Sequence, residues 1–384
     1  MSGRADTLIV GGGVVGLALG YELLARAPTR RVVVVDRGMP GHGATWAAGG
    51  MLAPISEAET ESADTLRLGL DSLARYPGFV GAIERLTRLD TGFDLRGTLW
   101  AAIGRDDRAE LDRQAQALAD AGHRIEPLSA AATLALEPRL SGRVVSGLRL
   151  PDEGQIDPRR LSAALLGAIE ALGGLVLPNV EVTSIQAERS GRFVVRARDR
   201  DSIEQAFEAT QVALAAGAWS FRGITLPLAD PGLRPVKGQL VRLRGPRLVS
   251  HVVRTPRAYL IPRADGELLV GATVEEVGFD ERSTAGAVME LLRAAWEALP
   301  ALEDLALVET SVGFRSAVDD HRPRIGPTEI EGLFLAVGHY RNGVLLAPAT
   351  AAYLAQAMLE GGVPLALAPF LPRPSASVAG ELRA

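Results

Sequence analysis

The chain has 384 residues, which exceeds one ordinary hydrophobic core and indicates two domains. Hydrophobic residues make up 47% and charged residues 23%, a globular composition, and a net charge of -5 gives no electrostatic basis for binding nucleic acid or an anionic membrane. The absence of cysteine excludes disulfides, thiolate metal sites and a cysteinyl cofactor bond, and the five histidines lack a metal-binding spacing, so no metal site is expected.

The N-terminal residues 7–36 predict a β-α-β unit. Leu8–Val10 is a short apolar strand, Gly11, Gly13 and Gly16 form a GxGxxG turn, and a helical pattern continues to Pro28. Arg31–Val35 is a second buried strand that ends at Asp36, an acid about 20 residues past the glycines. We therefore expect a dinucleotide-binding site at this turn.

Each residue type of this unit suits a dinucleotide. Gly11 permits the tight turn, Gly13 lets a pyrophosphate approach the backbone, and Gly16 lets the helix pack closely on the strand. The helix N-terminus offers free N–H groups to phosphates, and Asp36 can accept hydrogen bonds from ribose hydroxyls. These residues do not separate NAD from FAD. The alternative interpretation is a glycine-rich turn without a ligand.

The chain continues with helices over 59–88 and 106–122, separated by a strand at Thr98–Ile103. A helix over Pro158–Leu172 ends at Gly173-Gly174, and strands follow at Leu175–Leu177, Val180–Ile185, Phe193–Arg198 and Val212–Ala215. Residues 236–275 are spaced as an antiparallel meander with a hairpin turn at Asp265-Gly266. A helix over 282–299 and strands at Ala306–Phe314 and Leu333–Val337 complete the pattern, and the tail after Pro369 is expected to be frayed.

Nucleotide-type segments thus occur at the start, middle and end of the chain. The sequence predicts an α/β fold with a Rossmann-like, discontinuous nucleotide-binding domain and an antiparallel-sheet substrate domain. We assign 1–75, 150–225 and 312–384 to the first domain, and 76–149 and 226–311 to the second. The apolar start carries Asp6 and three glycines, and no run reaches the ~20 apolar residues of a membrane span, so a cytoplasmic protein is expected.

Seven segments resemble the FAD-dependent D-amino acid oxidase superfamily, and within it the glycine oxidases of thiamine biosynthesis. They are the N-terminal unit, "GATWAAGGMLAP" at 43–54, "AAGAWS" at 215–220, "PVKGQ" at 235–239, "YLIPRADGELLVGAT" at 259–273, "GFRSAVDDHRPRIGP" at 313–327 and "GHYRNGVLLAPAT" at 338–350. They span the whole chain in the family's order. The small residues of 43–54 independently leave backbone exposed for a flat, close ligand.

The resemblance implies FAD as the cofactor. It places the flavin ring and its ribityl chain against 44–51, the adenine end at Val182, and the helix that begins at Val344 against the electron-rich edge of the ring. Some relatives tether FAD through a histidine where this chain has Ala47, so non-covalent FAD is expected. The cofactor-binding residues so implied are Gly11, Gly13, Val14, Val15, Gly16, Asp36, Arg37, Ala44, Thr45, Gly49, Gly50, Met51, Val182, Gly217, His339, Tyr340, Arg341, Asn342, Gly343, Val344 and Leu345.

The resemblance also implies three substrate-binding residues. Arg315 matches the arginine that holds the substrate carboxylate, Tyr259 matches a tyrosine of the same pocket, and Arg341 projects to the substrate side. A planar guanidinium can bind a carboxylate through two parallel hydrogen bonds. The alternative for either arginine is a structural pair with Asp319 or Asp320. No histidine is assigned as a base, because hydride transfer from a neutral amine requires none, and His339 is expected only to adjoin the flavin.

The implied activity is oxidation of glycine to iminoacetate, which hydrolyses to glyoxylate and ammonia while O2 becomes H2O2. The expected product use is thiazole synthesis for thiamine, and a homo-oligomer, often a tetramer, is implied. Alternatives are a sarcosine or D-amino acid oxidase, a quinone-linked dehydrogenase, and a non-catalytic dinucleotide-binding regulator. Two departures from the family pattern are Ser316, where proline is frequent, and Arg257, where histidine occurs; Arg257 would admit a more acidic substrate.

Overall fold

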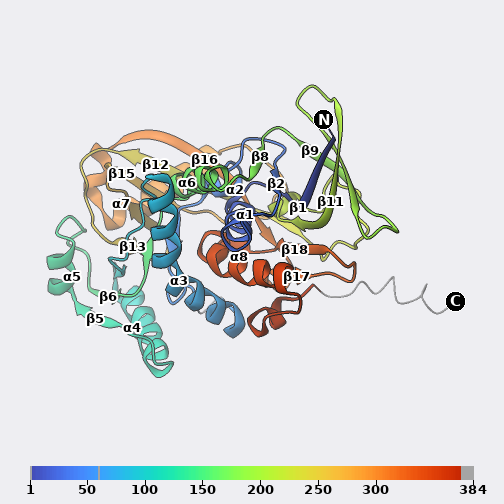
Figure 1. Ribbon diagram of the computed structural model, residues 1–384. Coiled ribbons are helices and arrows are strands. Elements are labelled where there is room, and N and C mark those ends of the chain that lie inside the picture. Colours follow the sequence, from blue (N-terminus) through green and yellow to red (C-terminus); the bar gives the residue numbers. More distant parts are fainter. Residues whose placement is uncertain (1, 59–60, 373–384) are drawn as a thin grey trace.

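A computed structural model describes residues 2–58 and 61–372, and its two large sheets lie in separate halves of the molecule (Figure 1). The helices of the chain are α1 (Val14–Arg26), α2 (Ala44–Ala47), α3 (Ala63–Thr87), α4 (Arg105–Asp120), α5 (Ala130–Leu136), α6 (Pro158–Ala171), α7 (Ala285–Ala298) and α8 (Gly343–Glu360). Short 3-10 segments within the described residues include Gly217–Trp219, Pro300–Asp304, Tyr340–Asn342 and Leu365–Phe370.

The first sheet has the strand order β17-β18-β11-β1-β2-β8, and β9 and β10 extend it from β11. Strands β1, β2, β8, β11 and β18 run parallel, whereas β17 is antiparallel to β18. The bounds are β1 (Ser2–Val10), β2 (Val32–Val35), β8 (Leu175–Leu177), β9 (Glu181–Ala187), β10 (Phe193–Arg198), β11 (Glu204–Leu214), β17 (Arg324–Pro327) and β18 (Leu333–Val337).

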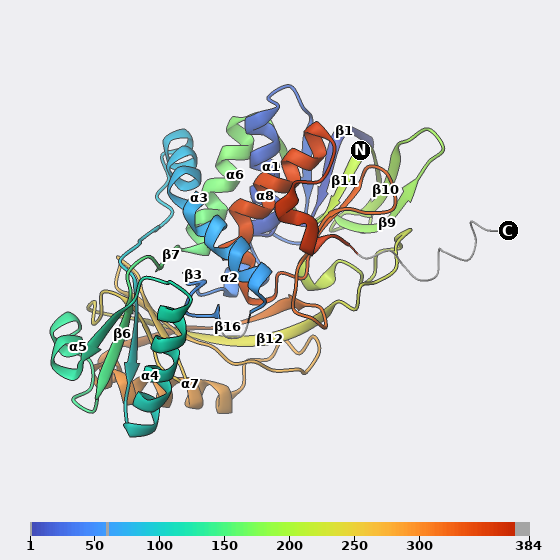
Figure 2. The ribbon, with the colours of Figure 1, turned by 90° about the horizontal axis from the view of Figure 1, so that it is seen from below.

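The central strands of this sheet are buried on both faces, which explains the run of four valines in β2. Helices α1, α3, α6 and α8 lie side by side over one face (Figure 2). Their apolar residues form one core with the sheet, while residues of β9 and β10 close a second core on the other face. The carboxyl ends of β1, β2, β11 and β18 therefore open toward the second half of the molecule, where ligands bind in such sheets.

The second sheet is largely antiparallel, with the order β16-β12-β15-β14-β13-β4-β6-β5. One of its cores lies against α7, and a smaller apolar cluster of β12, β13, β14 and β15 contacts Met51 of the first domain. The bounds are β4 (Thr98–Ala102), β5 (Glu126–Ser129), β6 (Ser146–Leu150), β12 (Arg234–Arg244), β13 (Val252–Arg254), β14 (Tyr259–Pro262), β15 (Glu267–Gly271) and β16 (Ala306–Ala317). A two-stranded pair, β3 (Met51–Leu52) with β7 (Gly154–Gln155), lies between the large sheets.

This architecture confirms the predicted fold class. The meander over 236–275 is present, with the turn at Asp265-Gly266 between β14 and β15. The helix predicted over 59–88 begins at Ala63, because Ser62 caps it through the Thr65 N–H; positions 59 and 60 lie outside the described residues, as does the tail from 373 onward. The strand predicted at Val212–Ala215 is the buried end of β11, whose first half alternates exposed polar residues.

The division into two domains at the stated boundaries stays a prediction. In the part of the chain that the structure describes, every helix is too short or too polar to cross a bilayer.

Candidate functional site

Within the described residues, 2–58 and 61–372, one cavity of about 900 Å³ brings together the predicted site residues. All of them except Gly16 line its wall, including the three substrate-binding candidates Tyr259, Arg315 and Arg341. The lining comes from β1, β2 and α8 of the first half and from β12, β13, β14 and β16 of the second. Its volume lies at the upper end of the ~300–1,000 Å³ range of ligand pockets, as a large cofactor with a small substrate requires.

The turn between β1 and α1 is shaped by its glycines. A Cβ at Gly11 would lie 2.5 Å from the Ala215 carbonyl oxygen, at a φ of +112°, and one at Gly16 would lie 1.9 Å from the Gly11 oxygen. These two glycines therefore allow close backbone packing. A Cβ at Gly13 would have only Thr45 Oγ1 nearby, at 3.5 Å, so Gly13 leaves open space at the N-terminus of α1. That space is a cradle for a pyrophosphate.

Asp36 lies at the end of β2, on the cavity wall. Its Oδ2 accepts a hydrogen bond from the Gly12 N–H at 2.7 Å, and its Oδ1 accepts one from the Gly38 N–H at 2.8 Å. The backbone thus fixes the carboxylate between the glycine turn and the following loop. Each oxygen retains a lone pair for a ribose hydroxyl.

An aromatic group that the sequence analysis missed lies at this end of the cavity. The guanidinium of Arg37 stacks over the ring of Trp219 at 3.5 Å, and Trp219 packs on Phe279 with ring centroids 3.9 Å apart. Burial lowers the pKa of Arg37, and nearby Asp36 opposes that change. The "GAW" triplet is the only sequence signal for this group, since Phe279 comes from a distant loop.

The segment 43–52 crosses the middle of the cavity. Thr45 Oγ1 accepts from the Val14 N–H at 3.1 Å and so joins this segment to the start of α1. Gly50 has a φ of +77°, and a Cβ there would lie 2.0 Å from the Ile156 oxygen. A Cβ at Gly49 would meet Ile261 and Tyr259, so this glycine permits direct packing against β14. The chain thus exposes backbone toward the cavity at this point.

The N-terminus of α8 faces the same region. Its N-cap, Asn342, makes no side-chain cap hydrogen bond and instead donates to Glu61 Oε1 at 2.9 Å. The first N–H groups of α8 can therefore serve a ligand. His339 is buried against Thr350, 3.1 Å from its hydroxyl, and burial lowers its pKa to about 4. The imidazole is therefore neutral at pH 7, and His339 lines the cavity.

Arg315 and Tyr259 form the floor of the substrate end. Arg315 Nη1 donates to the carbonyl oxygens of Lys237 and Thr273, at 3.2 and 3.0 Å. Its guanidinium crosses Gly238, where a Cβ would lie 2.6 Å from Nη1. Tyr259 lies over Gly271, and burial raises its pKa, so the phenol stays protonated at neutral pH. These contacts hold both side chains before any substrate arrives.

Arg341 is exposed and lies 5.0 Å from the ring of Tyr340. The two aspartates considered as its structural partners bind elsewhere, Asp319 to Arg234 and Asp320 to Arg324. Glu57 and Glu61 are instead the acids that interact electrostatically with Arg341.

Two further charged residues were missed by the sequence analysis. Arg254 and Glu57 both line the cavity and form an ion pair at 3.5 Å. Arg254 is the register partner of Tyr259 across β13 and β14, which brings it to the same face of the sheet. Arg257, which was expected to supply charge at the entrance, also lines the cavity and pairs with Glu297 of α7. Arg254 lies five positions before Tyr259 and in another strand, so period-two alternation from Tyr259 does not reach it; the hairpin register brings the two residues together.

Ser316 also has a structural explanation. Its hydroxyl accepts from the Gly338 N–H at 3.1 Å, which ties the end of β16 to the turn before α8. The proline frequent at this place could not accept that bond.

The glycine cradle, the fixed Asp36, the exposed backbone of 43–52 and the α8 N-terminus fit a dinucleotide that carries a planar ring. The chain matches the model of the family described as FAD dependent oxidoreductase over residues 6–357. It is 34% identical to glycine oxidase of Geobacillus kaustophilus, over 96% of this chain and 97% of that protein. A crystal structure of glycine oxidase from Geobacillus kaustophilus superposes with a TM-score of 0.88, at 33% identity, over 97% of this chain and 99% of that one.

Two further relatives extend the comparison. The bifunctional protein ThiO/ThiG of Synechocystis is 34% identical over 97% of this chain, which spans 54% of that protein. Iminodiacetate oxidase from Chelativorans sp. BNC1 superposes with a TM-score of 0.83, at 28% identity, over 96% of this chain and 100% of that one. With these matches and the site geometry together, the chain belongs to the family of FAD-dependent oxidoreductases.

Proposed function

We propose that this protein is a glycine oxidase that uses non-covalent FAD. The net reaction is glycine + O2 + H2O → glyoxylate + NH3 + H2O2, with iminoacetate released first. The observation that carries the proposal is that Arg315, Arg341 and Tyr259 line one cavity with the exposed backbone of 43–52. FAD, when bound, supplies the acceptor for the substrate's α-hydrogen and two electrons.

Arg315 anchors the substrate carboxylate in this proposal. Because its Nη1 is held by two carbonyl oxygens, the guanidinium is oriented without cost at the moment of binding. Arg341, on the short segment that precedes α8, is the second guanidinium that the proposal assigns to the carboxylate. Tyr259 and Met51 line the same cavity, and in this proposal they limit the substrate to a small amine and exclude water from it.

The charges around Tyr259 favour a carboxylate. The phenol interacts electrostatically with Arg315, Arg254, Arg341 and Glu57, and Glu61 is a second acid beside Arg341. Burial raises the pKa of Glu61, so the guanidinium groups outweigh the carboxylates in this part of the cavity. Glycine and sarcosine each bring a carboxylate to this positive charge.

An anaerobic titration tests the proposal. Glycine is expected to bleach the absorbance of the oxidised flavin, and air is expected to restore it with one H2O2 per glyoxylate. A kcat/KM for D-alanine or D-proline far above that for glycine would instead assign a D-amino acid oxidase. Good reduction of dyes with poor reduction of O2 would identify the protein as a dehydrogenase. If no amine bleaches the flavin, the protein would be assigned as a non-catalytic dinucleotide-binding regulator.

We further propose that the imine product supplies thiazole synthesis, supported by the similarity to the ThiO/ThiG protein. A homo-oligomer, with a tetramer as the expected size, is part of the same proposal, and light scattering of the holoenzyme tests it. The residue at the tether position is Ala47, which cannot form a bond to flavin. Flavin retained in an acid-precipitated pellet would contradict non-covalent binding.

A further inference from the structure

One face of β14 packs against the segment 43–52, which crosses the middle of the cavity. Tyr259, Ile261 and residue 263, which follows the strand, alternate toward the same side. Tyr259 and Ile261 pack on Gly49, where a Cβ would lie 3.3 and 2.7 Å from their side-chain atoms. Arg263 reaches the same glycine with its guanidinium, and Nη2 donates to the Gly49 carbonyl oxygen at 2.5 Å. A substrate-binding residue and a buried cation thus hold one peptide from two points.

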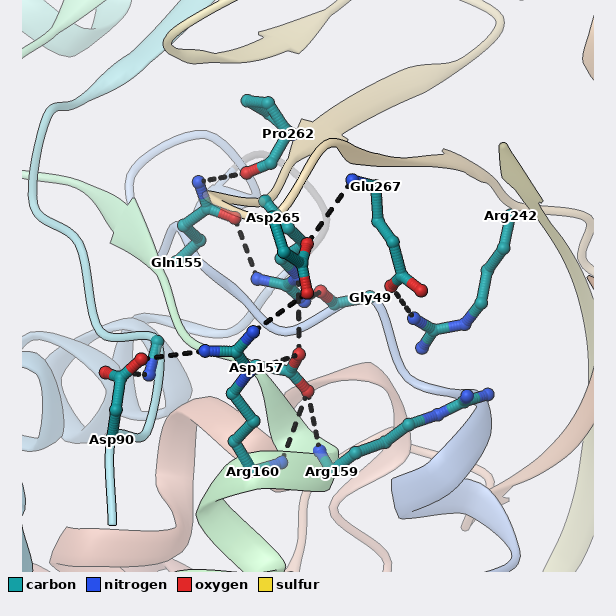
Figure 3. A network of polar contacts seen from close by, with 12 residues as sticks. Gly49, Asp90, Gln155, Asp157, Arg159, Arg160, Arg242, Pro262, Asp265 and Glu267 are labelled. Carbon is teal, nitrogen blue, oxygen red and sulfur yellow. Dashed lines mark hydrogen bonds and ion pairs between the residues drawn. The ribbon is translucent and has the colours of Figure 1, made fainter. Parts of the chain in front are cut away.

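Arg263 is only 4% exposed and does not line the cavity. Its Nη1 donates to Gln155 Oε1 at 2.7 Å, and Gln155 Nε2 donates in turn to the Pro262 carbonyl oxygen at 2.7 Å (Figure 3). Nε lies 4.0 Å from Oδ2 of Asp157, the residue that caps α6. Figure 3 shows Gln155 and Asp157 on the two sides of this network, with Gly49 beside them. Both partners position the guanidinium, and Asp157 balances its charge.

A guanidinium buried to this degree is expected to have a specific role, because its desolvation is costly. Burial lowers the pKa of Arg263 to about 10, so it is still protonated at neutral pH. A neutral side chain of similar volume would hold the domains together without that cost. The cation therefore requires an explanation beyond packing.

The peptide between Gly49 and Gly50 explains why a cation is buried at position 263. A trans peptide is planar, so its C=O and N–H point in opposite directions. Because Arg263 holds the Gly49 oxygen on one side, the Gly50 N–H points away from Arg263. The Gly50 carbonyl is fixed separately, by the Ile156 N–H at 2.9 Å. Among residues 2–58 and 61–372, no group accepts a hydrogen bond from the Gly50 N–H. Both Gly49 and Gly50 line the cavity.

We propose that Arg263 is a positioning residue that orients the Gly49–Gly50 peptide so that the Gly50 N–H is presented to the flavin ring. The inference rests on the proposed placement of the flavin against 44–51. An N–H directed at an acceptor of the ring stabilises the electron-rich reduced form more than the oxidised form. Arg263 acts through the peptide rather than on the flavin itself, and through Tyr259 the same grip sets the substrate relative to the ring.

The test uses Arg263→Met and Arg263→Lys in the holoenzyme, with Arg242→Met as the matched control. Arg242 is also buried, at 1% exposure, and binds Glu267 in the neighbouring strands, but it does not line the cavity. The readouts are the two-electron reduction potential of the bound flavin, its absorption spectrum, and the dissociation constant of FAD. None of these requires an amine substrate, so they remain informative if glycine is not oxidised.

For Arg263→Met we expect a tenfold or greater loss in the equilibrium constant for flavin reduction, which corresponds to a potential about 30 mV lower. The flavin spectrum is expected to shift, and FAD affinity to fall about tenfold. Arg263→Lys keeps the charge and one hydrogen bond, so an intermediate value is expected, and this variant serves if Arg263→Met does not fold. Arg242→Met is expected to lower the unfolding temperature and leave the potential unchanged.

Two results would overturn the proposal. One is a wild-type potential and spectrum in Arg263→Met, which would reduce the residue to a structural contact. The other is an equal shift in Arg242→Met, which would attribute the effect to general loosening of the domain boundary.

Discussion

The two ends of the cavity are built in different ways. At the dinucleotide end, the wall is largely backbone: Gly11 allows the tight packing of the turn, Gly13 leaves open space, and Asp36 is held by two N–H groups. At the substrate end, the wall is made of side chains, and Arg315, Tyr259 and Arg254 come from three different strands. A backbone site depends on local conformation, whereas a side-chain site depends on how distant strands are ordered in the sheet. The two ends should therefore respond differently to mutation.

The largest effect is expected from Gly13→Ala. The new methyl group would have no backbone neighbour, and only Thr45 Oγ1 lies near it, at 3.5 Å. The protein should therefore fold, but the methyl occupies the space in which the pyrophosphate lies against the helix N-terminus. We expect a loss of FAD affinity of at least about 100-fold, of the order of 3 kcal/mol. Equilibrium dialysis of apoprotein with FAD measures it.

Gly11→Ala is the comparison variant for that experiment. Its methyl would lie 2.5 Å from the Ala215 oxygen at a positive φ, so the fold itself should be disturbed. The expected pattern is an apoprotein of normal melting temperature for Gly13→Ala and a lowered one for Gly11→Ala. Normal FAD binding by Gly13→Ala would show that the pyrophosphate does not lie in the space at Gly13.

The second largest effect is expected from Arg315→Leu, at the substrate end. Loss of the guanidinium removes one side of a charged pair with the substrate and should cost about 2–5 kcal/mol of binding. KM for glycine should rise accordingly, while the protein stays yellow because the dinucleotide end is untouched. Steady-state peroxide production measures KM. Arg257→Leu is the control, since Arg257 is paired with Glu297, and it should change KM little. An unchanged KM in Arg315→Leu would show that Arg315 does not bind the substrate carboxylate.

The same contrast explains what the sequence could predict. The GxGxxG turn, Asp36 and the valine run of β2 are neighbours in the chain, so period and spacing were sufficient to predict the β-α-β unit. The pairing of β13 with β4 was not predictable, because it joins residues about 150 positions apart in parallel register. Arg254 was missed although Tyr259 was identified, because their proximity depends on the register of β13 with β14, which spacing along one strand does not give. The first half of β11 was missed because its polar alternation resembles a loop.

Ion pairs between distant side chains were also beyond the sequence. Arg254 and Arg257 look alike in the sequence. In the structure, however, Arg254 binds Glu57 of the cavity wall, whereas Arg257 binds Glu297 of α7. Both arginines line the cavity, and only the three-dimensional arrangement decides which acid each guanidinium binds. Ser316 is a similar case, since its role depends on the Gly338 N–H.

A third prediction concerns a buried acid behind the substrate end. Glu153 is fully buried and accepts hydrogen bonds from the Ser56 N–H and hydroxyl, next to the cavity residue Glu57. Burial raises the pKa of Glu153 to about 7. Because the pKa is higher in the folded than in the unfolded state, this group stabilises the fold fully below pH ~4.5, and that contribution is lost as pH rises through 7.

Glu153→Gln isolates this contribution, because the amide is neutral at every pH and its oxygen still accepts from Ser56. Between pH 4.5 and 8, the wild type should lose up to about 3 kcal/mol more unfolding free energy than the variant. Urea unfolding of both proteins across this range measures the difference, in which all other titrating groups cancel. Parallel curves for the two proteins would show that Glu153 does not titrate differently in the folded state.

The smallest effect is expected at Asp36, and it sharpens the comparison most directly. Asp36→Asn keeps the shape of the side chain, but its amide nitrogen faces a backbone N–H of either Gly12 or Gly38 in place of an acceptor. About tenfold weaker FAD binding is expected, close to 1.4 kcal/mol, the size of one net hydrogen bond. Asp36→Glu retains the charge and both acceptors on a longer stem and should bind FAD more tightly than Asp36→Asn.

Isothermal titration of the three apoproteins with FAD and with its 2′,3′-dideoxyadenosine analogue separates the two roles of this carboxylate. The analogue keeps the pyrophosphate but lacks the hydroxyls of the adenosine ribose, so a loss that appears only with FAD assigns Asp36 to those hydroxyls. An equal loss with both ligands assigns it to support of the glycine turn alone. In the second case Asp36 would also act by shaping backbone, and the contrast with the substrate end would be sharper.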